Sequence, residues 1–184
     1  MWLFIVVFII LLFLIFPILI IVPLSLSSSK FFIFPPKEIS LEWFYNLFSE
    51  TLWVDSILRS LEIAFFSTIL SLIIGLMAAV GCYRLNFNGK KIFMAIMVSP
   101  MMIPVIVVGI ALYRFYSEIN IVGTTAGMVI GHSLIAIPLV FVTVLTSLNG
   151  FDRNLELAAL NLGSNPIGVF FKIILPNIKQ AVIA

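Results

Sequence analysis

Few residues in this 184-residue chain place an ionisable side chain where it could do chemistry. Glu62 and His132 fall inside long apolar stretches, and a charge at the centre of a bilayer costs about 2.5–3.5 kcal/mol or more. Glu62 could attract a cationic solute, but we favour an interfacial ion pair with Arg59, three residues earlier on the same helix. His132 could contact a solute or a proton, but we expect it to hydrogen-bond a neighbouring helix.

Motifs for covalent or ATP chemistry are not found in the sequence. The nearest approach to a phosphate-binding loop is Gly89-Lys90-Lys91, which has Arg84 in place of the first glycine and no Ser or Thr after the lysine. A single cysteine, Cys82, and a single histidine exclude an internal disulfide and a zinc cluster. The carboxylates are scattered over separate loops. We therefore expect no enzymatic activity, no cofactor and no metal site.

The composition indicates an integral membrane protein. Hydrophobic residues make up 62% of the chain and charged residues 10%, which is too little polar surface for a soluble globule of this length. The mean hydropathy is +1.26. The net charge of +2 is small and scattered, with no basic stripe, so we expect no binding to nucleic acid. We predict an all-α, multi-span helical bundle embedded in a lipid bilayer.

Four apolar stretches are long enough to cross a hydrocarbon core of about 30 Å at about 1.5 Å per residue. The first, 2–26, exceeds the apolar region of a signal peptide and has no cleavage site, so we expect it to be retained. The other three are 57–83, 92–114 and 123–148. Another apolar segment begins at 177–184. We interpret it as the start of a fifth span, and we expect this chain to be a fragment or truncated product of a longer protein.

The loops between these stretches predict an orientation. The 84–91 loop is short and purely basic, so the positive-inside rule places it in the cytoplasm. The amino terminus and the 149–176 segment then lie inside, and 27–56 and 115–122 lie outside. The 27–56 segment mixes charged and aromatic residues, a composition that suits helices lying at a membrane surface.

Prolines and glycines interrupt the third and fourth spans. Pro100 and Pro104 prevent a regular helix in the inner half of the third span, and broken backbone at this depth must face protein or water. The break could line a permeation path or could be a kink required for packing. Gly123, Gly127 and Gly131 recur every four residues, a spacing that favours close helix contact.

The 152–176 segment is the one long interval that predicts a folded, water-facing element. Leu155, Ala158, Ala159 and Leu162 recur at helical spacing on one side, with Arg153, Asn154, Glu156 and Asn161 elsewhere. Gly163 predicts the end of this helix, and Ser164 with Pro166 predicts the cap and first turn of a second helix. The second helix would carry Ile167, Phe170, Phe171 and Ile174. Such an exposed apolar stripe indicates a docking surface for a protein in the aqueous phase.

The spacing in this hairpin resembles a known motif. Ala158-Ala159, three residues, Gly163, nine residues and then Ile173-x-Leu175-Pro176 match the cytoplasmic EAA loop of permease subunits in bacterial ATP-binding-cassette (ABC) importers. In this chain Leu157 occupies the position of the motif's glutamate, and the acid stands one residue earlier as Glu156. The similarity extends through GFDRNLELAALNLG, SPMMIPVIVVGIAL and GHSLIAIPLVFVTV, and it is greatest to the spermidine/putrescine permeases.

The resemblance implies a type I permease of the cell inner membrane that carries a polyamine and couples ATPase closure to alternating access. It implies cytoplasmic ATP-binding subunits, a second homologous permease and an extracytoplasmic solute-binding protein as partners. The residues implied in ATPase docking are Glu156, Leu157, Ala158, Ala159, Gly163, Phe170, Ile173, Leu175 and Pro176. Candidate residues of the solute path are Pro100, Pro104, His132, Pro138 and Glu62.

Three alternatives stay open beside this hypothesis. The same machinery could carry another small solute, such as ferric iron or an organic cation. The chain could be a non-transporting membrane scaffold that recruits a cytosolic partner through the hairpin. An ion-driven secondary transporter is disfavoured, because inverted repeats and carboxylates near mid-span are not found.

Overall fold

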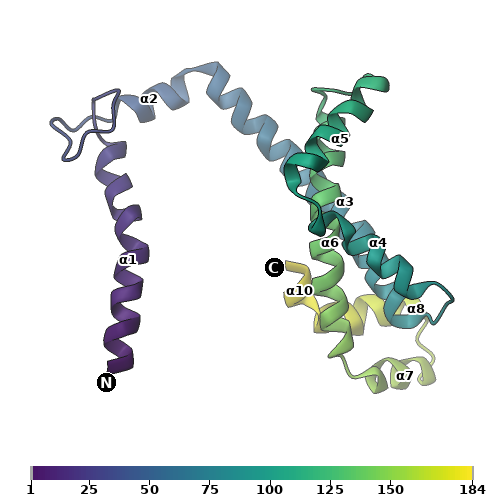
Figure 1. Cartoon of the computed structure of the whole chain (residues 1–184). Helices are drawn as coiled ribbons and strands as arrows, with labels where there is room; N and C mark the ends of the chain where they lie inside the picture. Colours follow the sequence, from purple (N-terminus) through teal and green to yellow (C-terminus); the bar gives the residue numbers. More distant parts are fainter. Residues whose placement is uncertain (1, 184) are drawn as a thin grey trace. The chain divides into compact units, whose positions relative to one another are not determined.

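The structure is a computed structural model that describes residues 2–183, and every regular element in this range is a helix. The chain forms two compact units, one ending at Leu58 and the other beginning at Arg59. In chain order the elements are α1 (Trp2–Ser25), α2 (Glu42–Ser49), α3 (Thr51–Arg84), α4 (Lys90–Met102), α5 (Val105–Glu118), α6 (Thr125–Asn149), α7 (Arg153–Asn161), α8 (Pro166–Val169), the π-helix η1 (Phe170–Ile174), α9 (Leu175–Asn177) and α10 (Lys179–Ile183). Figure 1 labels all of them except η1 and α9, which follow α8.

Three helices are long and apolar enough to cross a membrane. They are α1, α3 and α6, with 24, 34 and 25 residues. The pair α4 and α5 is a fourth candidate if it counts as one span. None of the residues of α1 is buried, and the helix is apolar on all sides, as a helix surrounded by lipid or by other helices must be. The protein is therefore an all-helical membrane protein with several spans.

The third predicted span, 92–114, is not one straight helix. Helices α4 and α5 meet at an angle of 101°, and the break lies at Ile103 and Pro104. Ile103 has extended backbone, as a residue before proline prefers. Pro100 instead stays inside α4, contrary to our expectation that both prolines would disrupt the inner half. Pro100 has no N–H, so it cannot donate the usual helical hydrogen bond to the carbonyl of Ile96. The Ser99 hydroxyl donates a hydrogen bond of 2.8 Å to that carbonyl instead.

Small residues allow α3 and α6 to cross closely in the second unit. Ser67, Ser71, Gly75 and Ala79 recur every four residues along α3, and all four are buried. A Cβ atom added at Gly75 would lie 2.7 Å from the Val140 side chain of α6. The hydroxyl of Ser133 on α6 donates a hydrogen bond of 2.7 Å to Val129 O of its own helix and lies 3.3 Å from Ser67 O of α3. Small residues with interhelical polar contacts are typical of membrane helix packing.

The predicted glycine ladder of the fourth span serves two purposes rather than one. A Cβ at Gly127 would lie 2.6 Å from the carbonyl oxygen of Ile121, and one at Gly131 would lie 3.5 Å from Leu112 of α5. Gly127 therefore permits a close contact, but with the turn that precedes α6, whereas 3.5 Å at Gly131 is an ordinary van der Waals distance that does not require a glycine. Gly123 lies before the helix with open space around it and a φ of +74°, so it supplies a turn and not a helix contact.

The main hydrophobic core of the second unit lies at the end where the hairpin packs. Helix α6 contributes Phe141, Val144 and Leu148, and α3 contributes Ala79 and Cys82. The hairpin and the residues after it complete the same cluster with Ala159, Val169, Ile174 and Ile178. The hairpin is thus packed against the ends of two long helices.

Candidate functional site

Standard capping interactions define the first helix of the hairpin. The carboxylate of Asp152 accepts a hydrogen bond of 2.9 Å from the backbone N–H of Asn154 at the start of α7. At the other end, Ser164 N–H donates to Ala159 O at 3.1 Å and Gly163 N–H donates to Leu160 O at 3.0 Å. This pair of bonds is a Schellman motif, and Gly163 has a φ of +87°. Gly163 therefore has the left-handed conformation predicted for it.

The cap of the second helix lies one residue later than predicted, at Asn165 and not at Ser164. Asn165 caps it, with Oδ1 accepting a hydrogen bond of 2.5 Å from the N–H of Gly168, and Pro166 occupies the first turn. The prediction that Ser164 caps this helix is wrong, because the backbone of Ser164 completes the preceding Schellman motif. Asn165 has the extended backbone that a cap residue requires.

A π-helical segment changes which side chains of the second helix face the core. Val169, Ile174 and Ile178 are fully buried, and η1 begins directly after Val169 and ends at Ile174. The predicted stripe of Ile167, Phe170, Phe171 and Ile174 is therefore divided: Ile174 is buried, whereas Ile167 and Phe171 are exposed. A π-helix has more residues per turn than an α-helix, so the residues after it face a different side of the helix. A prediction based on α-helical spacing does not include this shift.

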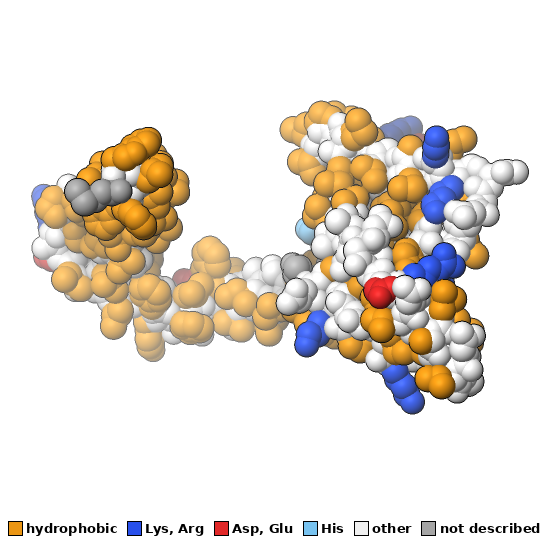
Figure 2. Space-filling view, turned by 90° about the horizontal axis from the view of Figure 1, so that it is seen from below, with side chains coloured by type: hydrophobic (Ala, Val, Ile, Leu, Met, Phe, Trp, Pro, Cys, Tyr) orange, Lys and Arg blue, Asp and Glu red, His pale blue; other side chains and the backbone are white. Residues whose placement is uncertain are grey.

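Helix α7 turns one charged and one small side chain inward. Glu156 and Ala159 are buried, whereas Leu155, Leu157 and Leu162 are exposed. The exposed side of the hairpin therefore carries three leucine side chains beside polar ones such as Arg153 and Asn154. Figure 2, the view from below, shows hydrophobic side chains at the surface of this end of the second unit, with Lys and Arg side chains around them.

The buried Glu156 forms an ion pair with the end of a long helix. Its Oε1 lies 2.6 Å from Nη2 of Arg84, the last residue of α3. The side chains are 27% exposed for Arg84 and 8% exposed for Glu156. Sequence reasoning assigned both residues to cytoplasmic loops but did not pair them. The expected pair of Arg59 with Glu62 is not formed, since the only other ion pair in residues 2–183 joins Arg114 and Glu118.

Of the five candidate residues of the solute path, only His132 lines the cavity between α5 and α6. A cavity of about 300 Å³ lies between α5 and α6, and His132 lines it together with Tyr116. Its lining does not include the other four candidates: Pro100, Pro104, Pro138 and Glu62. His132 Nδ1 lies 2.8 Å from Met128 O, within its own helix. The expected bond from His132 to a neighbouring helix is thus replaced by one along α6.

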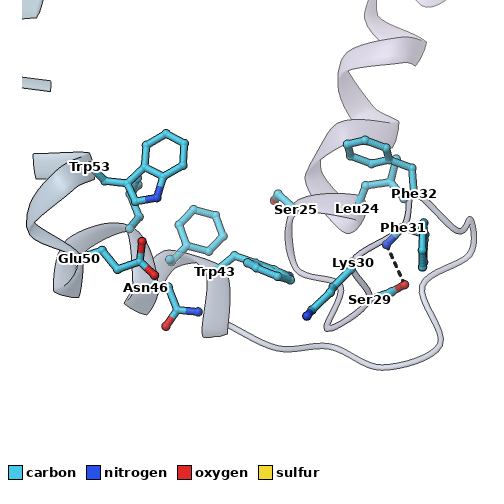
Figure 3. Close-up of a pocket in the computed structure, with 12 residues that line it drawn as sticks. Leu24, Ser25, Ser29, Lys30, Phe31, Phe32, Trp43, Asn46, Glu50 and Trp53 are labelled. Atoms are coloured by element: carbon cyan, nitrogen blue, oxygen red, sulfur yellow. Dashed lines mark hydrogen bonds between the residues drawn. The ribbon is translucent and has the colours of Figure 1, made fainter. Parts of the chain in front are cut away.

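A larger pocket of about 510 Å³ lies within the first unit, between the end of α1, the following loop, α2 and the start of α3. Figure 3 shows Trp43, Trp53 and Glu50 on one side of it, and Phe31 and Lys30 on the other. The indole N–H of Trp43 donates a hydrogen bond of 2.9 Å to Ser27 O, which ties α2 to the loop. The sequence showed only an aromatic and charged interval here. The pocket combines aromatic faces with a carboxylate, groups that bind organic cations.

Comparisons with known proteins agree with this architecture. Residues 71–184 match the family described as "Binding-protein-dependent transport system inner membrane component". The spermidine/putrescine transport system permease protein PotC of Haemophilus influenzae is 31% identical over 91% of this chain and 65% of its own length. PotC of Escherichia coli K12 is 32% identical over 91% of this chain and 63% of its own length. The putrescine transport system permease protein PotI of the same strain is 30% identical over 91% of this chain and 62% of its own length.

These matches establish the family and a common membrane setting. The chain spans somewhat less than two thirds of the length of these relatives. A probable molybdenum ABC transporter permease of Haloferax volcanii is 29% identical over 68% of this chain, so related permeases are named for different solutes. The family model covers α6 and the whole hairpin, and it includes the end of α3. This chain belongs to the family of inner membrane components of binding-protein-dependent transport systems.

Proposed function

We propose that this chain is the membrane-spanning permease subunit of an ATP-driven importer and forms part of the solute path. The observation that carries the proposal is the hairpin of α7 to α9. Its inner side shares one core with α3 and α6, while Leu157, Leu162 and Phe171 stay exposed on it. An exposed apolar surface on a well-packed element suits a protein partner. Membership of a binding-protein-dependent transport family supports the same function.

The proposed partners are cytoplasmic ATP-binding subunits, a second similar permease and an extracytoplasmic solute-binding protein. ATP hydrolysis belongs to the ATP-binding subunits in this proposal. Their closure would draw the hairpins of the two permeases together. Because the hairpin shares its core with α3 and α6, its displacement would tilt both helices and expose a central path alternately to either side of the membrane.

Polyamines are the proposed solutes. Several relatives are named as spermidine/putrescine or putrescine permeases. The pocket of the first unit adds physical support, because the indoles of Trp43 and Trp53 and the carboxylate of Glu50 can bind an ammonium group. The Lys30 ammonium group in the same lining opposes a cation, so the proposal rests on the names of the relatives. Ferric iron or another organic cation is the alternative solute.

Uptake measurements test both the transport and the solute. In membrane vesicles that contain this protein with its ATP-binding, permease and binding-protein partners, we expect ATP-dependent uptake of labelled putrescine or spermidine. Ferric iron and molybdate serve as control solutes. We also expect the binding protein to stimulate ATP hydrolysis. Association with an ATP-binding subunit without uptake of any of these solutes, and without stimulation, would favour the scaffold alternative instead.

The proposed orientation has the amino terminus and the hairpin in the cytoplasm, as the basic 84–91 loop indicates. A cysteine placed at Asn88 should react with an impermeant maleimide only from the cytoplasmic side, and a cysteine at Ser28 only from outside. The native Cys82 is buried and would be replaced by serine to remove background. Labelling of the two positions from the opposite sides would reverse the topology.

A further inference from the structure

The ion pair between Arg84 and Glu156 joins the hairpin to a membrane helix at a buried point. Arg84 ends α3, and Glu156 lies in the first turn of α7, so the pair connects two elements far apart in sequence. A carboxylate that is 8% exposed is stable only when its charge is compensated. The Arg114–Glu118 pair is different, because its partners are four residues apart on one chain segment and are 79% and 60% exposed.

The rest of α7 contributes little to the core that could hold the helix in place. Among its nine residues Ala159 is the one buried apolar side chain, and Leu160 is partly buried. A helix of this length is not stable alone in water and depends on its tertiary contacts. The second half of the hairpin is held differently, because Val169 and Ile174 are fully buried. Its packing does not need an ion pair.

We propose that Arg84 and Glu156 are positioning residues that anchor α7 to α3 and transmit the movement of the hairpin to that membrane helix. The proposal rests on the coupling function proposed above. It also accounts for the displaced acid in the hairpin motif. The carboxylate at position 156 faces inward to Arg84, while Leu157, 46% exposed, gives the outer side of α7 an apolar residue.

Hydrogen exchange tests the anchor without any partner protein. With the full chain in lipid nanodiscs, Glu156→Gln and Arg84→Gln should each speed the exchange of α7 backbone amides at least about tenfold, because breaking a buried pair leaves one charge uncompensated. The amides of α6 should keep their protection. Glu118→Gln and Arg114→Gln are matched controls, and an exposed pair should change exchange in α7 by less than about twofold.

The double variant Arg84→Glu/Glu156→Arg should restore most of the protection, because it keeps opposite charges at the two positions. Arg84→Lys is a second test that does not depend on the reversal, since it keeps the charge at position 84 and should preserve most of the protection. Unchanged exchange in both single glutamine variants would overturn the anchor.

Transport measurements test the transmission of movement. In the assembled transporter, the single glutamine variants should reduce the number of solute molecules imported per ATP hydrolysed by about tenfold, and the double variant should recover part of it. A normal ratio in variants whose α7 exchanges rapidly would overturn the transmission role. If the unaltered protein imports no solute with any partner, the proposed function fails, and the exchange experiment still decides whether the pair anchors α7.

Discussion

Replacement of Gly163 by valine is expected to cause the largest loss of coupling of any single change in the hairpin. The φ of +87° at this position places it in the left-handed region, where a residue other than glycine pays roughly 1–2 kcal/mol and a β-branched one more. The cost arises within the local backbone, because a Cβ built at Gly163 meets no heavy atom within 4 Å beyond its chain neighbours. We expect a loss of both solute uptake and association with the ATP-binding subunit, with normal insertion into the membrane.

Gly163→Asn is the matched control for this prediction. Asparagine also adds a side chain, but it tolerates the left-handed conformation far better than valine. We expect Gly163→Asn to retain most of the uptake and association that valine abolishes. Co-purification with the ATP-binding subunit and uptake in vesicles measure the two effects. Equal activity of the valine variant and the unaltered protein would show that this turn is not required for coupling.

Replacement of Gly75 by leucine is expected to have the largest effect on stability in the second unit. Even the Cβ atom would lie 2.7 Å from Val140 Cγ1, 2.8 Å from Val140 Cβ and 3.2 Å from the carbonyl oxygen of Ile137. Helices α3 and α6 would have to separate, and overpacking of this kind costs about 1–3 kcal/mol or more. Thermal unfolding in detergent or nanodiscs should show a clearly lower midpoint temperature.

The same two helices offer a control and a rescue. Gly81→Leu changes a glycine of α3 whose added Cβ would meet no heavy atom within 4 Å, so we expect a small change in the midpoint. Gly75→Ala is a milder change that adds only the Cβ atom. The double variant Gly75→Ala/Val140→Gly removes Val140 Cβ and Cγ1, the two atoms closest to that added Cβ, and should recover part of the lost stability. Destabilisation by Gly81→Leu as large as that by Gly75→Leu would contradict the close crossing of α3 and α6.

Local features of the hairpin and spans could be predicted from short stretches of sequence. Gly163 predicted a left-handed turn because few residues other than glycine adopt positive φ readily. The break at Pro104 followed from the missing N–H and from the restricted backbone of the preceding residue. The helical membrane class followed from composition, because a bilayer requires the backbone polar groups to be satisfied within helices.

Which side of each helix faces its neighbours was decided by the tertiary structure. The buried small residues of α3 around Gly75 recur every four residues, but the sequence does not show which neighbouring helix they meet, and we did not predict their contact with α6. The partner of Glu156 could not be read from α7, because Arg84 lies at the end of a distant helix. The nearby charge at Arg59 suggested a pair for Glu62 that does not form.

The sequence by itself determined the elements whose causes are local: the long apolar helices, the break before α5 and the turn at Gly163. The tertiary structure alone decided the anchor between Arg84 and Glu156, the crossing at Gly75 and the division of the hairpin into an inner and an outer side. The physical reason is the range of the interactions. Backbone preference and hydropathy act within a few residues, whereas a buried charge or a glycine contact depends on atoms that only folding brings within about 4 Å.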